Sequence, residues 1–274
     1  MKLTVVSIGN KNELALYNDG KLALLKNYGI TKKRIKDLDQ KDFSAIEKIK
    51  DFSTYEYKFE SLVDKTSNII CIGLNYSSHI EETKGDIPEY PLLFLKSNNA
   101  LAGNTAEIIA GNGFDVDYEG ELGVMIGKKT RNIREEDALD NVLGYFIGND
   151  VSSRFMQFKT SQWFIGKSFD NFFPNGPYLL TADEIPDPQN LNIKTYLNNE
   201  LRQNSNTKMM IYPVGKLIAY ISKFITLMPG DVISTGTPSG VILGMPKEKR
   251  NWIKPGDVVT VEIDKLGTLK NKFV

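Results

Sequence analysis

Hydrophobic residues in this chain occur mostly in short runs of strand length, separated by turns rich in Gly, Pro, Asn and Asp. Short apolar or alternating runs between such turns are typical of β-strands. We expect strands over residues 3–8, 13–17, 21–25, 68–74, 91–95, 119–126, 142–147, 232–235 and 258–263. The pattern therefore predicts an α+β protein that is mainly β and has few helices.

Three segments show helical patterns instead. Residues 45–52 form a charged helical stretch, and residues 134–139 form a second short one. Residues 214–224 follow Pro213, a residue favoured in the first turn of a helix, and their apolar side chains recur at helical spacing. The dipeptide Asn198-Asn199 separates two strand-like runs, which predicts a hairpin with left-handed turn residues.

The amino-terminal part of the chain differs from the rest in its polar residues. Its strand-like runs carry no cluster of polar side chains that converge on one place. A polar segment, residues 61–67, then precedes the unbroken apolar run of residues 68–74. The length of 274 residues is enough for a main domain with a small appendage. We therefore expect a small N-terminal domain over residues 1–66 and a main domain over residues 67–274.

Charge and hydropathy exclude several classes of partner. The chain has 34 Lys and Arg against 34 Asp and Glu, so no net field attracts a polyanion, and nucleic acid is not expected as a partner. The start of the chain turns polar after about seven residues, which is too early for a signal peptide. No later run approaches the roughly 20 apolar residues of a membrane span. We expect a soluble, cytoplasmic protein without membrane contacts.

The cysteine and histidine content limits the chemistry further. The single Cys71 lies in an apolar run, so a buried, inert thiol is the expected state, and no internal disulfide can form. His79 is the only histidine, which excludes zinc sites that need two or three imidazoles. Any metal site must therefore be built from oxygen ligands.

Two glutamates lie on one face of a predicted strand. Side chains alternate along a strand, so Glu119 and Glu121 share a side, opposite to the apolar positions that follow. A lone Glu-x-Glu pair is usually just part of a solvated face. Here, however, Gly120 thins the strand and a further carboxylate, Asp150, ends another predicted strand. Three carboxylates that converge suit a hard cation such as Mg²⁺ or Mn²⁺.

A second candidate cluster follows the strand of residues 68–74. His79 and Glu82 are three residues apart in a predicted helical turn, so the carboxylate could orient the imidazole as a general base. A lone surface histidine often has no role, but a position directly after a strand favours function. Further along, Arg154 and Lys167 could clamp a substrate carboxylate or stabilise an oxyanion, although a single such residue is more often a surface charge.

A loop of hydroxyl side chains between glycines follows the strand at residues 232–235. This loop, residues 234–240 (STGTPSG), could offer backbone N–H groups to an anion. It lacks the lysine of a phosphate-binding P-loop, so we do not predict a nucleotide site.

Taken in order, these segments resemble the fumarylacetoacetate hydrolase family from about residue 68 to residue 274. The matching stretches are residues 73–82 (GLNYSSHIEE), 94–96, 117–127, 149–154, 166–170, 176–177, 203–207, 229–240 and 255–257. The resemblance implies a mixed β-roll catalytic domain that is commonly a homodimer. It implies Mg²⁺ or Mn²⁺ at Glu119, Glu121 and Asp150. The catalytic pair falls on His79 and Glu82, and substrate contacts fall on Arg154, Gln157, Lys167 and Thr237.

The implied reaction concerns a small 2-oxo acid or 2-hydroxy-dienoate. The cation would polarise the 2-oxygen so that an enolate forms, Lys167 would stabilise the developing charge, and His79 with Glu82 would activate water for C–C hydrolysis. We expect acylpyruvate-type hydrolysis or isomerisation and decarboxylation of a dienedioate. The alternatives are dehydration of a sugar-derived 2-oxo acid and decarboxylation of oxaloacetate, and a catalytically silent metal-binding scaffold is the rival from outside the enzymes.

Overall fold

Two β-sheets form the frame of the computed structural model, which describes residues 1–83, 85–111 and 113–274. The larger sheet has the strand order β3-β2-β1-β13-β11-β10-β16-β5-β6, with β4 paired to β1 and β7 paired to β13. Its strands are β1 (Lys2–Ile8), β2 (Lys11–Asn18), β3 (Lys21–Leu24), β4 (Lys58–Phe59), β5 (Ile69–Gly73), β6 (Leu92–Lys96), β7 (Leu101–Gly103), β10 (Gly120–Ile126), β11 (Val142–Asn149), β13 (Phe173–Thr181) and β16 (Val232–Ser234).

The smaller sheet has the order β15-β14-β17-β18-β8. Its strands are β8 (Glu107–Ile108), β14 (Asn192–Leu197), β15 (Glu200–Asn206), β17 (Val258–Ile263) and β18 (Gly267–Phe273), and a separate short pair joins β9 (Val116–Asp117) to β12 (Ser152–Ser153). The structure is therefore mainly β, as the hydrophobic pattern predicts. The left-handed pair Asn198-Asn199 links β14 to β15, with φ of 52° and 68°, so the predicted hairpin is confirmed.

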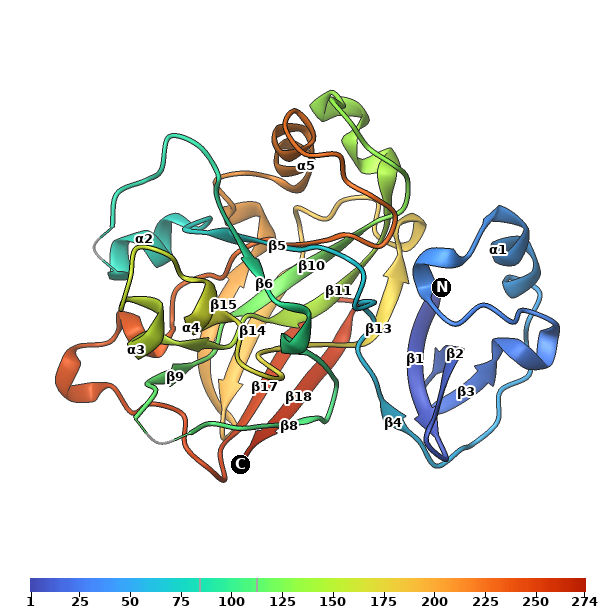
Figure 1. The fold of residues 1–274 in the computed structure, drawn as a ribbon, viewed down its shortest axis with the longest axis horizontal. Helices are drawn as coiled ribbons and strands as arrows, with labels where there is room; N and C mark the ends of the chain where they lie inside the picture. The colour runs from blue at the N-terminus through green and yellow to red at the C-terminus, as the bar shows by residue number, and fades with distance from the viewer. Residues whose placement is uncertain (84, 112) are drawn as a thin grey trace.

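Five short α-helices complete the described part of the fold. They are α1 (Gln40–Ile46), α2 (Ser77–Thr83), α3 (Arg154–Gln157), α4 (Phe164–Lys167) and α5 (Val214–Ser222). In Figure 1, α2, α3 and α4 lie together on one side of the sheets, and α1 lies at the other end of the molecule with β1, β2 and β3. Within the described residues, no helix combines the length and the apolar character needed to cross a membrane.

Two of the helix predictions need correction. The helix expected over residues 45–52 instead begins at Gln40, because Asp39 caps it: the Asp39 side chain accepts from the N–H groups of Lys41 and Asp42. The helix expected over residues 134–139 is a 3₁₀ helix, Glu135–Asn141, without a side-chain cap. The third prediction is confirmed within two residues, since α5 ends at Ser222.

The strand β13 is a central element that the hydrophobic pattern missed. It pairs antiparallel with both β1 and β11, so it joins the amino-terminal strands to the rest of the larger sheet. Pro174, Gly176 and Pro177 lie inside it, and these residue types normally indicate turns. The division into residues 1–66 and 67–274 stays a prediction, which expression of residues 67–274 alone would test.

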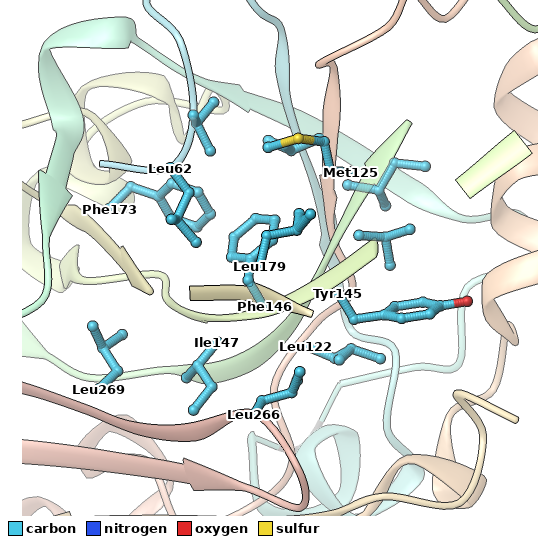
Figure 2. Close-up of a cluster of buried hydrophobic side chains, with 14 of the residues drawn as sticks. Leu62, Leu122, Met125, Tyr145, Phe146, Ile147, Phe173, Leu179, Leu266 and Leu269 are labelled. Atoms are coloured by element: carbon cyan, nitrogen blue, oxygen red, sulfur yellow. The ribbon is translucent and has the colours of Figure 1, made fainter. Parts of the chain in front are cut away.

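Side chains of β10, β11 and β13 form the buried core together with the β17–β18 hairpin (Figure 2). Leu122, Ile147 and Leu269 are at most 1% exposed. Burial of a large apolar side chain typically contributes about 1.5–3 kcal/mol, so this contact fixes the smaller sheet against β10 and β11.

The close approach of the two sheets also sets the direction of the side chains on β10. A Cβ atom at Gly120 would lie 2.3 Å from Oγ1 of Thr195 on β14, so only glycine fits there. Because successive side chains alternate, the neighbours of Gly120 point to the opposite face, away from the smaller sheet. Those neighbours are Glu119 and Glu121.

Candidate active site

Three buried carboxylates meet on that face of the larger sheet. β10 pairs antiparallel with β11, with Glu121 opposite Gly148 and Gly120 opposite Asn149. The next residue, Asp150, donates its backbone N–H to the Glu119 carbonyl at 2.8 Å. Oxygen atoms of Glu119, Glu121 and Asp150 all lie within 4.8 Å of one another, and we call these three residues the carboxylate cluster. The sequence prediction that they converge is confirmed.

Two of the three carboxylates are held by cations. Lys167 Nζ lies 2.7 Å from Oε2 of Glu119 and 2.8 Å from Oδ2 of Asp150. Lys96 Nζ donates to Oδ1 of Asp150 and, at 3.0 Å, to the Val151 carbonyl. Burial alone would lower the pKa of Lys167, but the charges of Asp150 and Glu119 more than offset it and raise that pKa. Lys167 therefore stays protonated between Glu119 and Asp150.

Glu121 differs from its two partners because no cation contacts it among the described residues. Its Oε2 accepts from the Ser234 hydroxyl at 2.5 Å and from the Gly236 N–H at 3.0 Å. Burial, together with the nearby charges of Asp150 and Glu119, raises the pKa of Glu121 well above its ordinary value. Glu119 shows the reverse: burial opposes ionisation, but Lys167 and Arg154 hold its pKa well below the ordinary value.

This donor set fits a divalent cation. The three ligands are hard carboxylate oxygens, which Mg²⁺ and Mn²⁺ prefer. Glu121 is 1% exposed and lacks a cationic partner among the described residues, so ionisation of its carboxyl is unfavourable until a cation binds beside it. Carboxylate oxygens carry more than one acceptor site, so Asp150 can keep its lysine contacts and still act as a ligand.

His79 and Glu82 meet on helix α2, as their spacing predicts. Nδ1 of His79 lies 2.9 Å from Oε1 of Glu82, and the other carboxylate oxygen accepts from the Gly240 N–H at 2.9 Å. The glutamate is thereby fixed at both oxygens, so it orients the imidazole with Nδ1 as donor. Among the described residues Nε2 of His79 has no hydrogen-bond partner, so it can accept or donate a proton.

A cavity of about 650 Å³ joins these two groups of residues. Its wall includes Glu119, Glu121 and Lys167 from the sheet side and His79 and Glu82 from α2. Apolar lining comes from Ile72, Leu74, Phe94, Phe158, Trp163, Leu243 and Met245. Phe94 and Trp163 pack edge to face at 5.4 Å between ring centroids. A cavity of this size and lining is typical of a small-molecule site.

Arg154, predicted to contact substrate, lies in the cavity wall but is largely committed to the protein. Its Nε donates to Oδ2 of Asp117 at 2.9 Å, its Nη1 donates to Oε1 of Gln157 at 2.9 Å, and its Nη2 lies 2.6 Å from Oε1 of Glu119. The guanidinium therefore fixes the Glu119 carboxylate and orients the Gln157 amide toward the cavity that both line.

Thr237 also lines the cavity, but its hydroxyl has two protein partners. Oγ1 donates to the Gly120 carbonyl at 2.9 Å and accepts from the Gln203 amide at 2.7 Å. Within the described part of the chain, its backbone N–H has no acceptor. The loop at residues 234–240 thus offers N–H groups to acceptors, as predicted. The Gly236 N–H donates to Glu121, and the Thr237 N–H remains available to another acceptor.

The structure adds residues that sequence reasoning did not select. Asp117 is fully buried and accepts from the N–H groups of Tyr118, Ile242 and Leu243 besides Arg154. Lys96 compensates the charge of Asp150, although the two residues are 54 positions apart in the sequence. Asp117 opens the acidic stretch that contains Glu119, and Lys96 directly follows the predicted strand of residues 91–95, but neither signal is specific. Cys71 is a buried free thiol, as expected.

Comparison with known proteins gives a consistent result. Residues 68–274 match the family described as fumarylacetoacetate (FAA) hydrolase C-terminal. An oxaloacetate tautomerase fahd2, mitochondrial, of Xenopus laevis is 46% identical over 215 residues, which cover 77% of this chain and 67% of the relative.

Solved structures extend the likeness to the whole chain. A putative HpcE protein from Mycobacterium smegmatis has a TM-score of 0.90 and 32% identity, covering 100% of this chain and 99% of the other. A 2-hydroxyhepta-2,4-diene-1,7-dioate isomerase from Mycobacterium marinum has a TM-score of 0.75 and 32% identity, covering 100% and 98%. The amino-terminal residues, which the family model leaves out, therefore have counterparts in these structures.

Proposed function

This chain belongs to the fumarylacetoacetate hydrolase family, and on that premise we propose that it interconverts the keto and enol forms of a small 2-oxo acid, with oxaloacetate as the first candidate substrate. The observation that carries the proposal is one cavity lined both by Glu119 and Glu121 and by the oriented pair His79–Glu82. A metal-binding group thus faces a proton-handling group across the same space. The tautomerase name of the Xenopus laevis relative supports this choice.

His79 supplies the proton transfer in this proposal. With Nδ1 donating to Glu82, the free Nε2 removes a proton from C3 of the substrate, and the resulting imidazolium is stabilised by the adjacent carboxylate. Return of a proton to the 2-oxygen gives the enol, and return to C3 regenerates the keto acid. The Gly240 N–H holds Glu82 in place, so the imidazole keeps its tautomer during both transfers.

The residues around the carboxylate cluster bind and orient the substrate. Glu119, Glu121 and Asp150 would hold Mg²⁺ or Mn²⁺, which polarises a carbonyl oxygen as a Lewis acid. Lys167 uses two of its three N–H groups on carboxylates and has a third for a substrate oxygen. In this proposal the backbone N–H of Thr237, a residue of the cavity wall, donates to the substrate carboxylate.

A second candidate function is C–C hydrolysis of an acylpyruvate. The cavity of about 650 Å³ is much larger than a four-carbon acid needs, so a longer substrate can enter. In this case the His79–Glu82 pair activates a water molecule for attack on a second carbonyl. We also propose a homodimeric assembly, which sedimentation would test directly.

The test follows both reactions in one set of proteins. Loss of oxaloacetate enol absorbance is measured with Mg²⁺ or Mn²⁺ and after chelation, and acylpyruvate cleavage is measured beside it. His79→Ala should lower the tautomerisation rate by about 10²- to 10⁴-fold, since the general base is gone. Ser78→Ala, on the same helix but outside the cavity wall, is the matched control.

Metal titration completes that experiment. His79→Ala should bind Mg²⁺ as the parent protein does, because the carboxylate cluster is unchanged. A full tautomerisation rate in His79→Ala would overturn the role of His79. If the parent cleaves acylpyruvate but does not speed tautomerisation above the metal-only background, the second function replaces the first.

A further inference from the structure

Two cations that line the active-site cavity have no carboxylate partner among the described residues. Lys247 and Arg250 belong to the segment that follows the 3₁₀ turn Ile242–Gly244, and both contribute to the cavity wall. Across the part of the chain that the structure describes, neither forms an ion pair. This sets them apart from Lys167 and Arg154, which are paired with carboxylates in the same cavity.

The Arg250 side chain is anchored at one point and free at its end. Its Nε donates to the Met245 carbonyl at 2.8 Å, while both terminal nitrogens lack a partner among the described residues. An anchored guanidinium with a free fork is suited to bidentate contact with a carboxylate. Lys247 is exposed at the edge of the cavity, so it adds a mobile point charge beside that fork.

The backbone of this segment is tied to the strand that leads into the carboxylate cluster. Asp117 accepts from the N–H groups of Ile242 and Leu243 at 2.9 and 3.0 Å. The Tyr118 hydroxyl donates to the Gly240 carbonyl at 2.8 Å. These bonds hold the start of the segment that carries Lys247 and Arg250 next to the strand that leads to Glu119.

We propose that Lys247 and Arg250 bind the distal carboxylate of a dicarboxylic 2-oxo acid, so that the enzyme selects dicarboxylates over monocarboxylates. The inference rests on the proposed function, in which the 2-oxo acid end of the substrate lies at the carboxylate cluster. A second carboxylate then needs its own positive partner, and among the described residues Glu82 pairs with His79 and not with either of these cations.

The experiment compares two substrates of equal carbon number, 2-oxoglutarate and 2-oxopentanoate, which differ in the distal carboxylate. Exchange of C3 protons for solvent deuterium is followed by NMR with Mg²⁺ present, and the ratio of kcat/KM for the two acids is the readout. Arg250→Met should lower this ratio by about 10- to 100-fold, because a charged hydrogen-bonding partner is lost. Lys247→Met should lower it less, since a single exposed charge is more weakly coupled.

Lys249→Met is the matched control: it lies in the same 3₁₀ turn, Lys247–Lys249, but outside the cavity wall, so its ratio should equal that of the parent. Calorimetric affinities of both acids are measured in parallel and do not depend on turnover. Exchange in the parent with an unchanged ratio in Arg250→Met would overturn the inference and leave the proposed function standing. No exchange, but a parent preference for 2-oxoglutarate that Arg250→Met abolishes, would overturn the proposed function and keep the dicarboxylate site.

Discussion

The carboxylate cluster and the Lys247–Arg250 pair hold charge in opposite ways within one cavity. In the cluster, every carboxylate is at least 95% buried and is held by protein hydrogen bonds, and Lys96 and Lys167 lie among the carboxylates. In the pair, Lys247 is exposed, and neither Lys247 nor Arg250 forms an ion pair with a carboxylate of the described chain. The carboxylates of the cluster are thus held in place by the protein itself, while the Lys247–Arg250 pair remains available to an anion from outside.

The largest expected effect is on folding, at the buried cation of the cluster. Lys96→Met removes a lysine whose side chain is 0% exposed and leaves Oδ1 of Asp150 and the Val151 carbonyl without their donor. Breaking a buried ion pair typically costs about 3–5 kcal/mol of unfolding free energy. Urea unfolding in the presence of chelator should show this loss. Lys249→Met should unfold as the parent does, and an equally stable Lys96→Met would contradict the account.

The next effect is on metal binding. Glu121→Gln removes a ligand that has no cationic partner, and we expect Mg²⁺ affinity to fall by about 100-fold or more by calorimetric titration. The chelated protein should be as stable as the parent or more stable. The amide oxygen still accepts from Ser234 and Gly236, and a buried carboxyl that ionises only at a cost in free energy is gone.

The same substitution two residues earlier gives the contrast for that prediction. Glu119→Gln removes a negative charge that holds Lys167 and Arg154, so the chelated protein should lose stability. If Glu119→Gln and Glu121→Gln changed the stability of the chelated protein equally, the distinct surroundings of the two carboxylates would not govern their behaviour. Unchanged Mg²⁺ affinity in Glu121→Gln would remove it from the ligand set.

The carboxylate cluster could be predicted from the sequence, whereas Lys96 and the Lys247–Arg250 pair could not. Strand alternation placed Glu119 and Glu121 on one face, and the end of another strand supplied Asp150, so the cluster could be predicted. Lys96 could not, because its partner is 54 residues away and only the pairing of β5, β16 and β10 brings the two strands near. Lys247 and Arg250 lie in a charged stretch, residues 247–250, that in sequence is indistinguishable from a solvated turn.

The fold shows the same limits. Strands with regular apolar runs were predicted to within a few residues, whereas β13 was missed because proline and glycine within it indicate turns. That strand is tolerated in the sheet because β7 pairs with residues 173–175, β1 pairs with residues 179–180, and the pairing with β11 shifts register between Gly176 and Leu180. The helix predicted at residues 45–52 was wrong because that prediction rested on the charged residues of the stretch. The capping residue Asp39, which marks the true start of the helix, was present in the sequence.

A smaller effect is expected at the proton-handling pair. Glu82→Gln keeps an acceptor for the Gly240 N–H but withdraws the charge that stabilises protonated His79. We expect kcat to fall by about tenfold, with Mg²⁺ affinity unchanged. Steady-state tautomerisation kinetics and metal titration check both statements. A parallel loss of metal affinity would mean that Glu82 supports the carboxylate cluster rather than the imidazole.

The smallest expected effect concerns salt, and it tests the contrast between buried and exposed charge directly. Interactions between exposed charges are screened strongly once the ionic strength exceeds about 0.1 M, whereas buried pairs are screened much less. Raising NaCl from about 0.05 M to about 0.5 M should therefore lower the kcat/KM ratio of 2-oxoglutarate to 2-oxopentanoate by a few-fold. The reaction of 2-oxopentanoate serves as the internal control, because this acid engages only the cluster end of the cavity. In Arg250→Met the ratio should depend less on salt, since part of the screened attraction is already absent. A ratio that stays constant with salt in the parent would mean that the distal carboxylate is held in a buried environment, and the exposed Lys247 would then have no share in its recognition.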